Sequence, residues 1–315
     1  MILRKAFIAI ISLLFVAFSY SCKTKSIEKE VIRLGYVPIA DAAQIFIAIE
    51  KGFFSDQNIE IEFEQLNSGA RILEAVSTGS VEIGLTSYVP LVLSNASGLQ
   101  LQAITGGAVE DKTHPEHAML VHKDSPIKSI TDLVGKTIAL NGRRNIDHMI
   151  LQELLEKNGL REGQVKIIEI PFPRMESVLS SKEIDVASMI EPYVTRSIEH
   201  GNTRLLIHNF LAVHDNIPIA CYAAKKEWIG KNRQLLRRFK TAFKKATLFC
   251  LSNSEETKTI IAKYTQLTED EIRKVGLPTF TDETNPDEFQ DLIERMYKRG
   301  LISSKMNSKD FIYVQ

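Results

Sequence analysis

The stretch that most constrains the fold runs from residue 74 to residue 90, where a helix end, a glycine, a strand and a polar exit follow one another. Apolar side chains at helical spacing stop at Gly79, which can adopt the left-handed conformation that ends many helices. Residues 81–85 then alternate in polarity with the period of a β-strand. Hydroxyl and phenol groups follow at residues 86–88, and in an open parallel sheet ligands bind at this end of the strands.

The same order of elements returns at residues 181–190, where small residues precede an acidic-flanked strand with a polar exit. Two sheets, each with polar groups beyond its strands, would hold a ligand between two lobes. Short links between strands and helices predict an α/β fold in which each lobe is a mainly parallel sheet flanked by helices. The predicted strands are 31–37, 59–63, 81–85, 99–105, 118–121, 136–140, 165–170, 184–190, 204–207 and 217–224. The predicted helices include 42–51, 70–78, 89–95, 146–155, 174–181, 234–251, 255–264, 269–275 and 286–299.

Two irregular segments divide this succession. Residues 109–116 are polar and carry a His-Pro pair, so we expect the chain to cross there into a second lobe, and residues 208–216 to carry the return. The predicted first lobe is therefore discontinuous, made of 31–116 and 213–315, and the second lobe is 117–212. A chain of 315 residues is long enough for two such units.

The charges balance, with 39 Lys and Arg against 39 Asp and Glu. No global field would attract nucleic acid, and the basic run at 233–245 is interpreted as the solvated side of a long helix. We therefore expect a small-molecule ligand and no nucleic-acid partner, no cofactor and no metal, in a protein that is monomeric.

The first residues predict export. Two basic residues precede an apolar run at 6–18, the length of a signal-peptide core and short for a membrane span. The junction at Cys22 resembles a bacterial lipobox, so we expect a signal peptide at 1–22, a lipid on Cys22, a flexible tether at 23–30 and a membrane-anchored lipoprotein facing the periplasm or cell exterior. Cleavage after Ser21 by an ordinary signal peptidase is the alternative.

Two further cysteines, Cys221 and Cys250, could pair in an oxidising compartment. Each lies in an apolar pattern, one in a strand and one in a helix, which favours two separately buried thiols.

Several polar residues have both a structural and a ligand-binding interpretation. Arg143 and Arg144 stand at the start of a helix, where cationic groups and the helix dipole would bind an anion or a carbonyl group, or else the arginines face water. Ser68 either caps the next helix or leaves its first-turn amides to a ligand. Glu191 faces either the cleft or the amides of the helix that follows Pro192.

The histidines give little sign of a metal site. The run from His114 to His117 is interpreted as a solvated hinge loop, because the proline disfavours a helix and no further ligands are near in sequence. His148, in the first turn of a cleft-facing helix, is the histidine we would test for ligand contact.

The succession of motifs resembles the substrate-binding proteins of the nitrate, sulfonate and taurine group, which also includes binders of thiamine-precursor pyrimidines. The resemblance rests on the order of several short motifs over nearly all of the mature chain. They are residues 34–38, 50–54, 67–69, 81–85, 124–127, 132–136, 184–187 and 191–192.

This resemblance implies a type II periplasmic-binding-protein fold with the ligand trapped between two lobes, and delivery to the permease and ATPase subunits of an ABC importer. The ligand would be nitrate-like, sulfonate-like or a pyrimidine, and the Arg143-Arg144 pair, which departs from the small residues usual there, favours an anion or a carbonyl-bearing ring. The residues that the resemblance assigns to ligand binding are Asp41, Ser68, Thr86, Ser87, Gly107, Asn141, Arg143, Asn145 and Glu191.

Enzymes of the same fold, in thiamine-pyrimidine or menaquinone-precursor synthesis, are the alternative. The scattered cysteines and the export signal disfavour both, so no catalytic residue is predicted.

Overall fold

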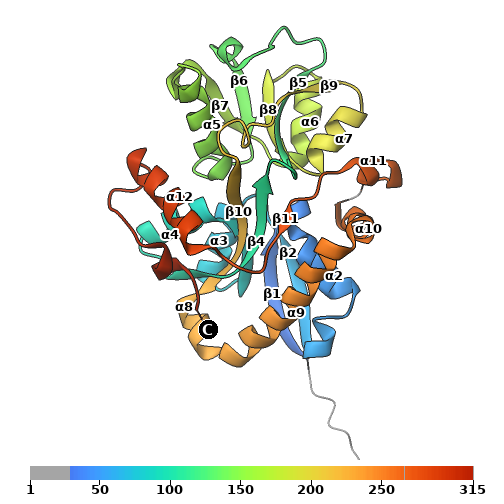
Figure 1. Ribbon diagram of the computed structural model, residues 1–315, viewed down its shortest axis with the longest axis vertical. Coiled ribbons are helices and arrows are strands. Elements are labelled where there is room, and N and C mark those ends of the chain that lie inside the picture. The colour runs from blue at the N-terminus through green and yellow to red at the C-terminus, as the bar shows by residue number, and fades with distance from the viewer. Residues whose placement is uncertain (1–28, 266, 315) are drawn as a thin grey trace, which may run out of the picture.

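The computed structural model describes residues 29–265 and 267–314, and it contains two β-sheets with helices packed on both. Figure 1 shows the two groups one above the other, with strands β5 to β9 in the upper group. The predicted signal peptide, the lipidation site Cys22 and most of the tether lie outside the described residues. Strand β1 begins at Glu30, one residue before the strand predicted from the sequence.

The strands lie at the predicted positions, apart from β11, which was not predicted. They are β1 (Glu30–Tyr36), β2 (Ile59–Gln65), β3 (Ile83–Ser87), β4 (Leu101–Asp111), β5 (His117–His122), β6 (Thr137–Leu140), β7 (Lys166–Glu169), β8 (Val186–Ile190), β9 (Thr203–Ile207), β10 (Asn216–Lys225) and β11 (Thr279–Phe280).

The larger sheet has six strands in the order β11-β4-β10-β3-β1-β2. Strand β1 pairs in parallel with both β2 and β3, whereas β10 pairs antiparallel with β3 and β4. The smaller sheet has the order β7-β6-β8-β5-β9, with β6 parallel to its neighbours and β5 antiparallel to its own.

Most strands of each sheet run in the same direction, as expected, but both sheets are mixed. The reason is that the chain changes sheets twice. It enters the smaller sheet as β5 and returns to the larger one as β10, and each of these strands runs against its neighbours. Strand β4 also runs on to Asp111, beyond residue 105, where the predicted strand ends.

The helices follow the predicted pattern. They are α2 (Ala43–Glu50), α3 (Gly69–Thr78), α4 (Tyr88–Ala96), α5 (Ile146–Lys157), α6 (Phe172–Ser180), α7 (Tyr193–Glu199), α8 (Lys226–Lys231), α9 (Arg233–Ser252), α10 (Ser254–Thr265), α11 (Glu269–Lys274) and α12 (Pro286–Lys298). Short 3-10 turns are η1 (Ala40–Ala42), η2 (Ser55–Gln57), η3 (Ile130–Leu133), η4 (Glu162–Gln164) and η5 (Ser308–Phe311).

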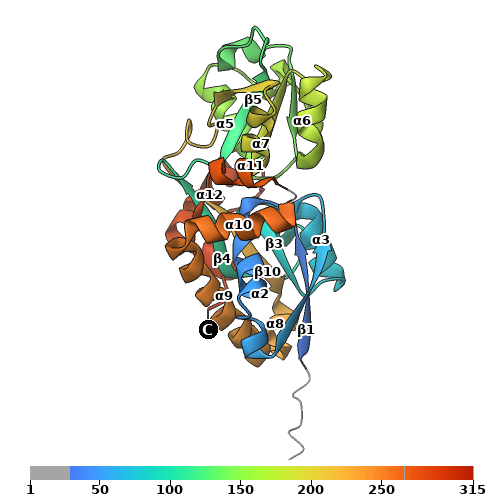
Figure 2. The ribbon, with the colours of Figure 1, turned by 90° about the vertical axis from the view of Figure 1, so that its right-hand side faces the viewer.

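Aromatic packing fixes the long C-terminal helices against the larger sheet. In Figure 2, α9 and α10 run beside α2, and Phe239 of α9 stacks on Phe54 with 5.3 Å between ring centroids. Phe243, one turn further on, meets Tyr222 of β10 edge to face at 4.8 Å. Burying aromatic side chains of this size contributes about 1.5–3 kcal/mol each.

Two segments of chain join the sheets. The first crossing is 112–116, between β4 and β5, and the second crossing is 208–215, between β9 and β10. They lie within the segments 109–116 and 208–216, where we expected the chain to cross. Within the described residues, none of the helices combines the length and apolar character needed to span a membrane.

Cys221 and Cys250 are both buried and free, as the sequence indicated.

Candidate functional site

A cavity of about 70 Å³ lies between the two sheets and takes its wall from both of them. Its apolar wall consists of Val37, Ile39, Leu85, Pro90, Ile146, Phe172, Ile190, Ile219 and Ala220. Its polar wall consists of Asp41, Thr86, Ser87, His117, Asn141, Asn145 and Asp147, with the backbone of Gly69 between them. At roughly 10–15 Å³ per water, this volume holds about five water-sized groups, which suits a solute of one small ring.

Five of the predicted residues meet in this cavity. Thr86 and Ser87 stand at the end of β3, and Ser87 is the N-cap of α4 without using its hydroxyl as a cap. Asn145 is the N-cap of α5, accepting from the backbone N–H of His148 at 2.9 Å, and its amide donates to Asn141 at 2.6 Å. Asp41 enters from η1, 1% exposed.

Ser68 lies beside the cavity and acts as a cap. Its hydroxyl accepts from the backbone N–H of Arg71 at 3.4 Å. A Cβ placed on Gly142 would lie 3.8 Å from the Ser68 Cβ, so Ser68 faces the loop before α5 across the cleft.

Gly107 does not line the cavity, because it is an interior residue of β4 rather than a strand exit. A Cβ there would lie 3.1 Å from the carbonyl oxygen of Ala220. The glycine therefore serves the close approach of β4 to β10.

Arg143 also does not line the cavity, contrary to our expectation. Its Nη2 donates to the carbonyl oxygen of Ile167 at 2.6 Å, and its guanidinium lies 3.9 Å from both Glu162 and Glu169. These acceptors direct the side chain toward η4 and β7. Arg144 is exposed and is likewise absent from the cavity wall.

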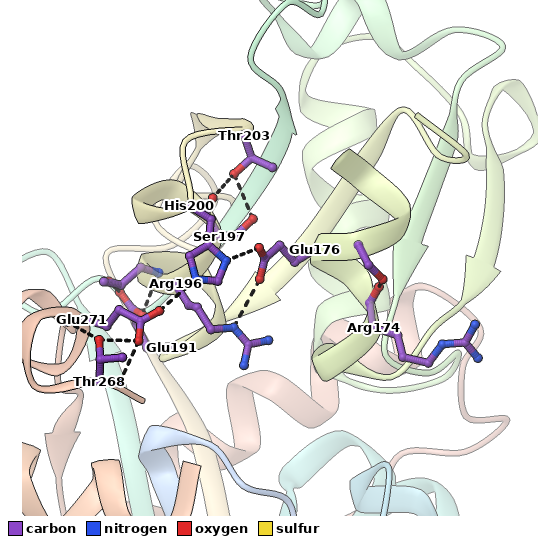
Figure 3. Close-up of polar contacts among 11 residues, drawn as sticks. Arg174, Glu176, Glu191, Arg196, Ser197, His200, Thr203, Thr268 and Glu271 are labelled. Carbon is purple, nitrogen blue, oxygen red and sulfur yellow. Dashed lines mark hydrogen bonds and ion pairs between the residues drawn. The ribbon is translucent and has the colours of Figure 1, made fainter. Parts of the chain in front are cut away.

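Glu191 faces the first turn of α7, the second of the two positions that we considered for it, rather than the cleft (Figure 3). Its carboxylate accepts from the backbone N–H of Thr195 at 3.1 Å, from the Thr195 hydroxyl at 2.8 Å and from the backbone N–H of Gly276 at 3.4 Å. Burial outweighs these hydrogen bonds and raises the pKa of Glu191 to about 7.

His148 is a buried residue of the first turn of α5 and does not line the cavity. Its Nδ1 accepts from the backbone N–H of Arg144 at 3.1 Å, and its Nε2 lies 3.3 Å from Glu162.

Sequence reasoning missed Asp147. It follows Ile146 in the first turn of α5, where it accepts from the Ser188 hydroxyl at 2.7 Å and from the Asn209 amide at 3.2 Å. Its other oxygen, Oδ2, is buried without a partner among the described residues. Burial raises the pKa of Asp147. An acidic residue in the first turn of a cleft-facing helix was the available signal.

Sequence reasoning also misplaced His117. We expected a solvated loop, but Glu116 and His117 are 1% and 4% exposed. The His117 Nδ1 lies 2.6 Å from Glu110 Oε2, and its ring stacks on Phe210. Burial lowers the pKa of His117, but Glu110, Asp147 and Asp41 together raise it by more, so that the pKa lies above its usual value.

The charged groups of the cavity wall are therefore two carboxyls and one imidazole, and no Lys or Arg belongs to the described wall. Asp41 Oδ1, like Asp147 Oδ2, is a buried acceptor without a partner among the described residues. Unsatisfied buried acceptors cost about 1–3 kcal/mol each, so the cavity favours a solute that donates hydrogen bonds.

Comparisons with known proteins agree with this architecture. The family model described as NMT1/THI5 like matches residues 39–257. A protein of Escherichia coli (strain K12), provisionally named as aliphatic sulfonates-binding, is 23% identical over 240 residues, covering 74% of this chain and 71% of that protein. The formylaminopyrimidine-binding protein of Halalkalibacterium halodurans is 22% identical over 184 residues, covering 56% and 54%.

Among solved structures, the crystal structure of the periplasmic aliphatic sulphonate binding protein SsuA from Escherichia coli superposes with a TM-score of 0.71. The sequences are 20% identical, and the match covers 90% of this chain and 97% of that one. The chain thus shares the two-lobed α/β fold of periplasmic binding proteins.

Proposed function

The chain belongs to the NMT1/THI5 like family, and from that membership we propose that it is the extracytoplasmic solute-binding subunit of an ABC importer. Two of its relatives are named as binding proteins for small solutes. The observation that carries the proposal is the cavity between the sheets, because polar groups at the ends of strands from both sheets meet around one small volume.

Capture would proceed by closure of two lobes, 31–116 with 213–315 against 117–212. The two crossings are the natural hinges, since they are the points where the chain passes from one sheet to the other. A solute that contacts Ser87 from one lobe and Asn145 from the other binds the closed state better than the open one, and this preference shifts the equilibrium.

The solute we propose is a small nitrogen heterocycle with amino groups, of the aminopyrimidine class. Asp41 and Asp147 offer acceptors for N–H groups, and Phe172 with the aliphatic wall suits the faces of a flat ring. A sulfonate or nitrate would meet these carboxyls without a Lys or Arg in the described wall. The proposed aminopyrimidine replaces the anionic ligand that we expected from Arg143 and Arg144.

An enzyme of this fold is the second candidate, and the thiols argue against it. Cys221 and Cys250 lie outside the cavity wall, and burial raises the pKa of the Cys250 thiol to about 12. Such thiols are protonated at neutral pH and are poor nucleophiles.

Membrane attachment through a lipid on Cys22 is part of the proposal, and the delivery partners would be a permease and an ATPase. If this is right, Cys22→Ala leaves the chain uncleaved or releases it from the membrane, as fractionation and mass spectrometry would detect. Unaltered processing and membrane partitioning would contradict the anchor.

The solute is tested by thermal unfolding of the purified chain with aminopyrimidines, taurine, alkanesulfonates and nitrate. A ligand at a hundredfold its Kd stabilises by about 2.7 kcal/mol. We expect this for an aminopyrimidine, with mass spectrometry showing the ligand unchanged. Stabilisation by a sulfonate alone would overturn the proposed class and keep the binding function, whereas conversion of the ligand would favour the enzyme.

The variant Asp147→Asn tests whether this carboxylate binds the solute. The amide keeps the shape and can still accept from Ser188, but it removes the acceptor charge, so affinity should fall by about tenfold or more. Asp124→Asn, an exposed aspartate of the same lobe, is the matched control.

A further inference from the structure

A second cluster of polar side chains lies behind the cavity, where β4 crosses into β5. Glu110, Glu116 and His117 each offer one donor atom, and these atoms all lie within 4.8 Å of one another. The three residues are 0%, 1% and 4% exposed. Charged side chains are rarely buried so completely unless they are paired or bind a metal ion.

The hydrogen bonds of the cluster satisfy only one of its carboxyls. Glu110 Oε1 accepts from the backbone N–H groups of Glu116 and His117, both at 3.2 Å, and Glu110 Oε2 lies 2.6 Å from His117 Nδ1. Both oxygens of Glu116 are buried without a partner among the described residues. The Asp41 carboxyl lies within hydrogen-bonding reach of the Glu116 carboxyl and also has an unpartnered oxygen among the described residues.

The acidic groups of this cluster also outnumber its single basic group. Three carboxyls, from Asp41, Glu110 and Glu116, surround one imidazole. A proton shared between Asp41 and Glu116 would satisfy one contact, but it would leave the remaining Glu116 lone pairs unused. A divalent cation would use them and offset the negative charge at the same time.

We propose that Glu110, Glu116 and His117 bind a divalent transition-metal ion, with Asp41 positioned to complete the coordination. One imidazole nitrogen among carboxylate oxygens suits Zn²⁺ or Mn²⁺, whereas Mg²⁺ and Ca²⁺ take oxygen ligands. Ligand atoms about 2.1 Å from a common ion are at most about 4.2 Å apart, so small side-chain movements would bring these donors together.

The position of this site gives the ion a structural role. Glu110 belongs to the larger sheet and His117 to the smaller one, so the ion would join the two lobes at the first crossing. Asp41 and His117 also line the solute cavity. Metal occupancy should therefore alter solute affinity, although the metal site itself does not depend on the identity of the solute.

Calorimetric titration of the chelator-treated, tag-free chain with Zn²⁺ and with Mn²⁺ tests the proposal, followed by thermal unfolding with and without each ion. We expect one ion per chain and a higher Tm with metal. Glu116→Gln, which keeps the shape, should weaken binding at least tenfold and abolish the metal-dependent rise in Tm. His114→Gln, on the same crossing but half-exposed, is the matched control and should bind as the parent does.

A parent chain that binds neither ion, or a Glu116→Gln variant that binds as tightly as the parent, would overturn the proposal. If Glu116→Gln does not fold, metal titrations of the parent chain and of Asp41→Asn still test the proposed site. A Tm that changes with pH and is indifferent to metal would identify the cluster as a protonated acid pair.

Discussion

At the scale of single residues, the buried carboxyls around the cleft differ in what they touch. Glu191 is held by three donors from the first turn of α7 and from Gly276, whereas Asp147 lines the cavity and has one oxygen without a partner among the described residues. The first arrangement stabilises a helix end, and the second remains available to a solute. Two residues of similar chemistry at similar strand or helix ends thus have different roles.

The raised pKa of Glu191 makes a prediction about stability and pH. Because its pKa is about 7 in the folded chain and 4.5 ordinarily, the folded state holds the proton more tightly. Its contribution is therefore fully present below about pH 4.5 and is lost as the pH rises through 7, by about 3 kcal/mol at most.

Urea unfolding of the parent and of Glu191→Gln at several pH values between 5 and 8 measures this contribution. The parent should lose more stability than the variant as the pH rises. Parallel profiles for the two proteins would contradict it.

A site residue could be predicted from the sequence when its position depends on residues close to it in the chain. Thr86, Ser87 and Asn145 directly follow strands or begin helices, so alternation and capping patterns placed them correctly. Arg143 was misplaced because its direction depends on the carbonyl of Ile167, far along the chain. His117 was misplaced because its burial depends on Glu110 of β4 and Phe210 of the second crossing, which no local pattern reveals.

At the scale of elements, α5 and α12 are joined across the cleft by a buried acid. Glu153 of α5 lies 3.3 Å from Arg295 and 3.1 Å from Arg299, and its Oε2 lies 2.5 Å from His214 Nε2. The Glu153 side chain is 6% exposed, while those of the arginines are about one-fifth exposed. Burial raises the pKa of Glu153, but the neighbouring cationic groups, His214 and Arg295 first, together lower it by more than burial raises it. The pKa therefore lies below its usual value, and the carboxylate stays charged.

We predict that Glu153→Gln destabilises the fold by about 2–3 kcal/mol, since it leaves two partly buried arginines without their main partner. Chemical unfolding measures this, and solute affinity should fall as well because the contact joins the two lobes. Glu156→Gln, whose side chain is 61% exposed and pairs with Arg299 alone, should cost under about 1 kcal/mol. Equal effects of the two variants would refute the distinction.

The glycines of β4 make a second prediction at this scale. A Cβ on Gly106 would lie 2.1 Å from the carbonyl oxygen of Glu283, which is backbone and cannot rotate away. Gly106→Ala should therefore destabilise by about 1–3 kcal/mol and lower the Tm. Gly163→Ala meets nothing within 4 Å and serves as the control. An unchanged Tm for Gly106→Ala would show that the C-terminal segment moves aside.

Element positions were largely predictable, but pairing was not. Helical and strand periods located nearly every element, whereas the two-residue strand β11 is too short to show a period. The placement of β10 between β3 and β4 follows from how the chain returns after the second crossing, which is a property of the whole path rather than of residues 216–225.

At the scale of the whole molecule, ionic contacts flank the cleft on two sides. One side has Glu153 with its arginines. On the other, His200 beside α7 lies between Glu176 and Glu271, with 3.1 Å between His200 Nε2 and Glu271 (Figure 3). Backbone contacts add to these, since the Ala40 N–H donates to the Glu191 carbonyl oxygen at 3.1 Å. The lobes are thus held together at several separate points.

This arrangement predicts a salt-dependent shape. Screening weakens ion pairs, more at the half-exposed His200 than at the buried Glu153, so the ligand-free chain should open as ionic strength rises, whereas the solute-bound chain should remain closed. Small-angle X-ray scattering at low and high salt measures the radius of gyration in both states. A ligand-free chain whose radius does not respond to salt would show that packing, rather than charge, sets the closure.

The position of β10 has a consequence for the order in which the protein is assembled. This strand occupies the middle of the larger sheet, yet every strand of the smaller sheet precedes it in the chain. During synthesis from the N-terminus, the edges of β3 and β4 that pair with β10 stay unpaired until residue 225 has emerged. The smaller sheet, whose strands precede β10, can already be complete by then. The part of the molecule that begins first is therefore the last to mature.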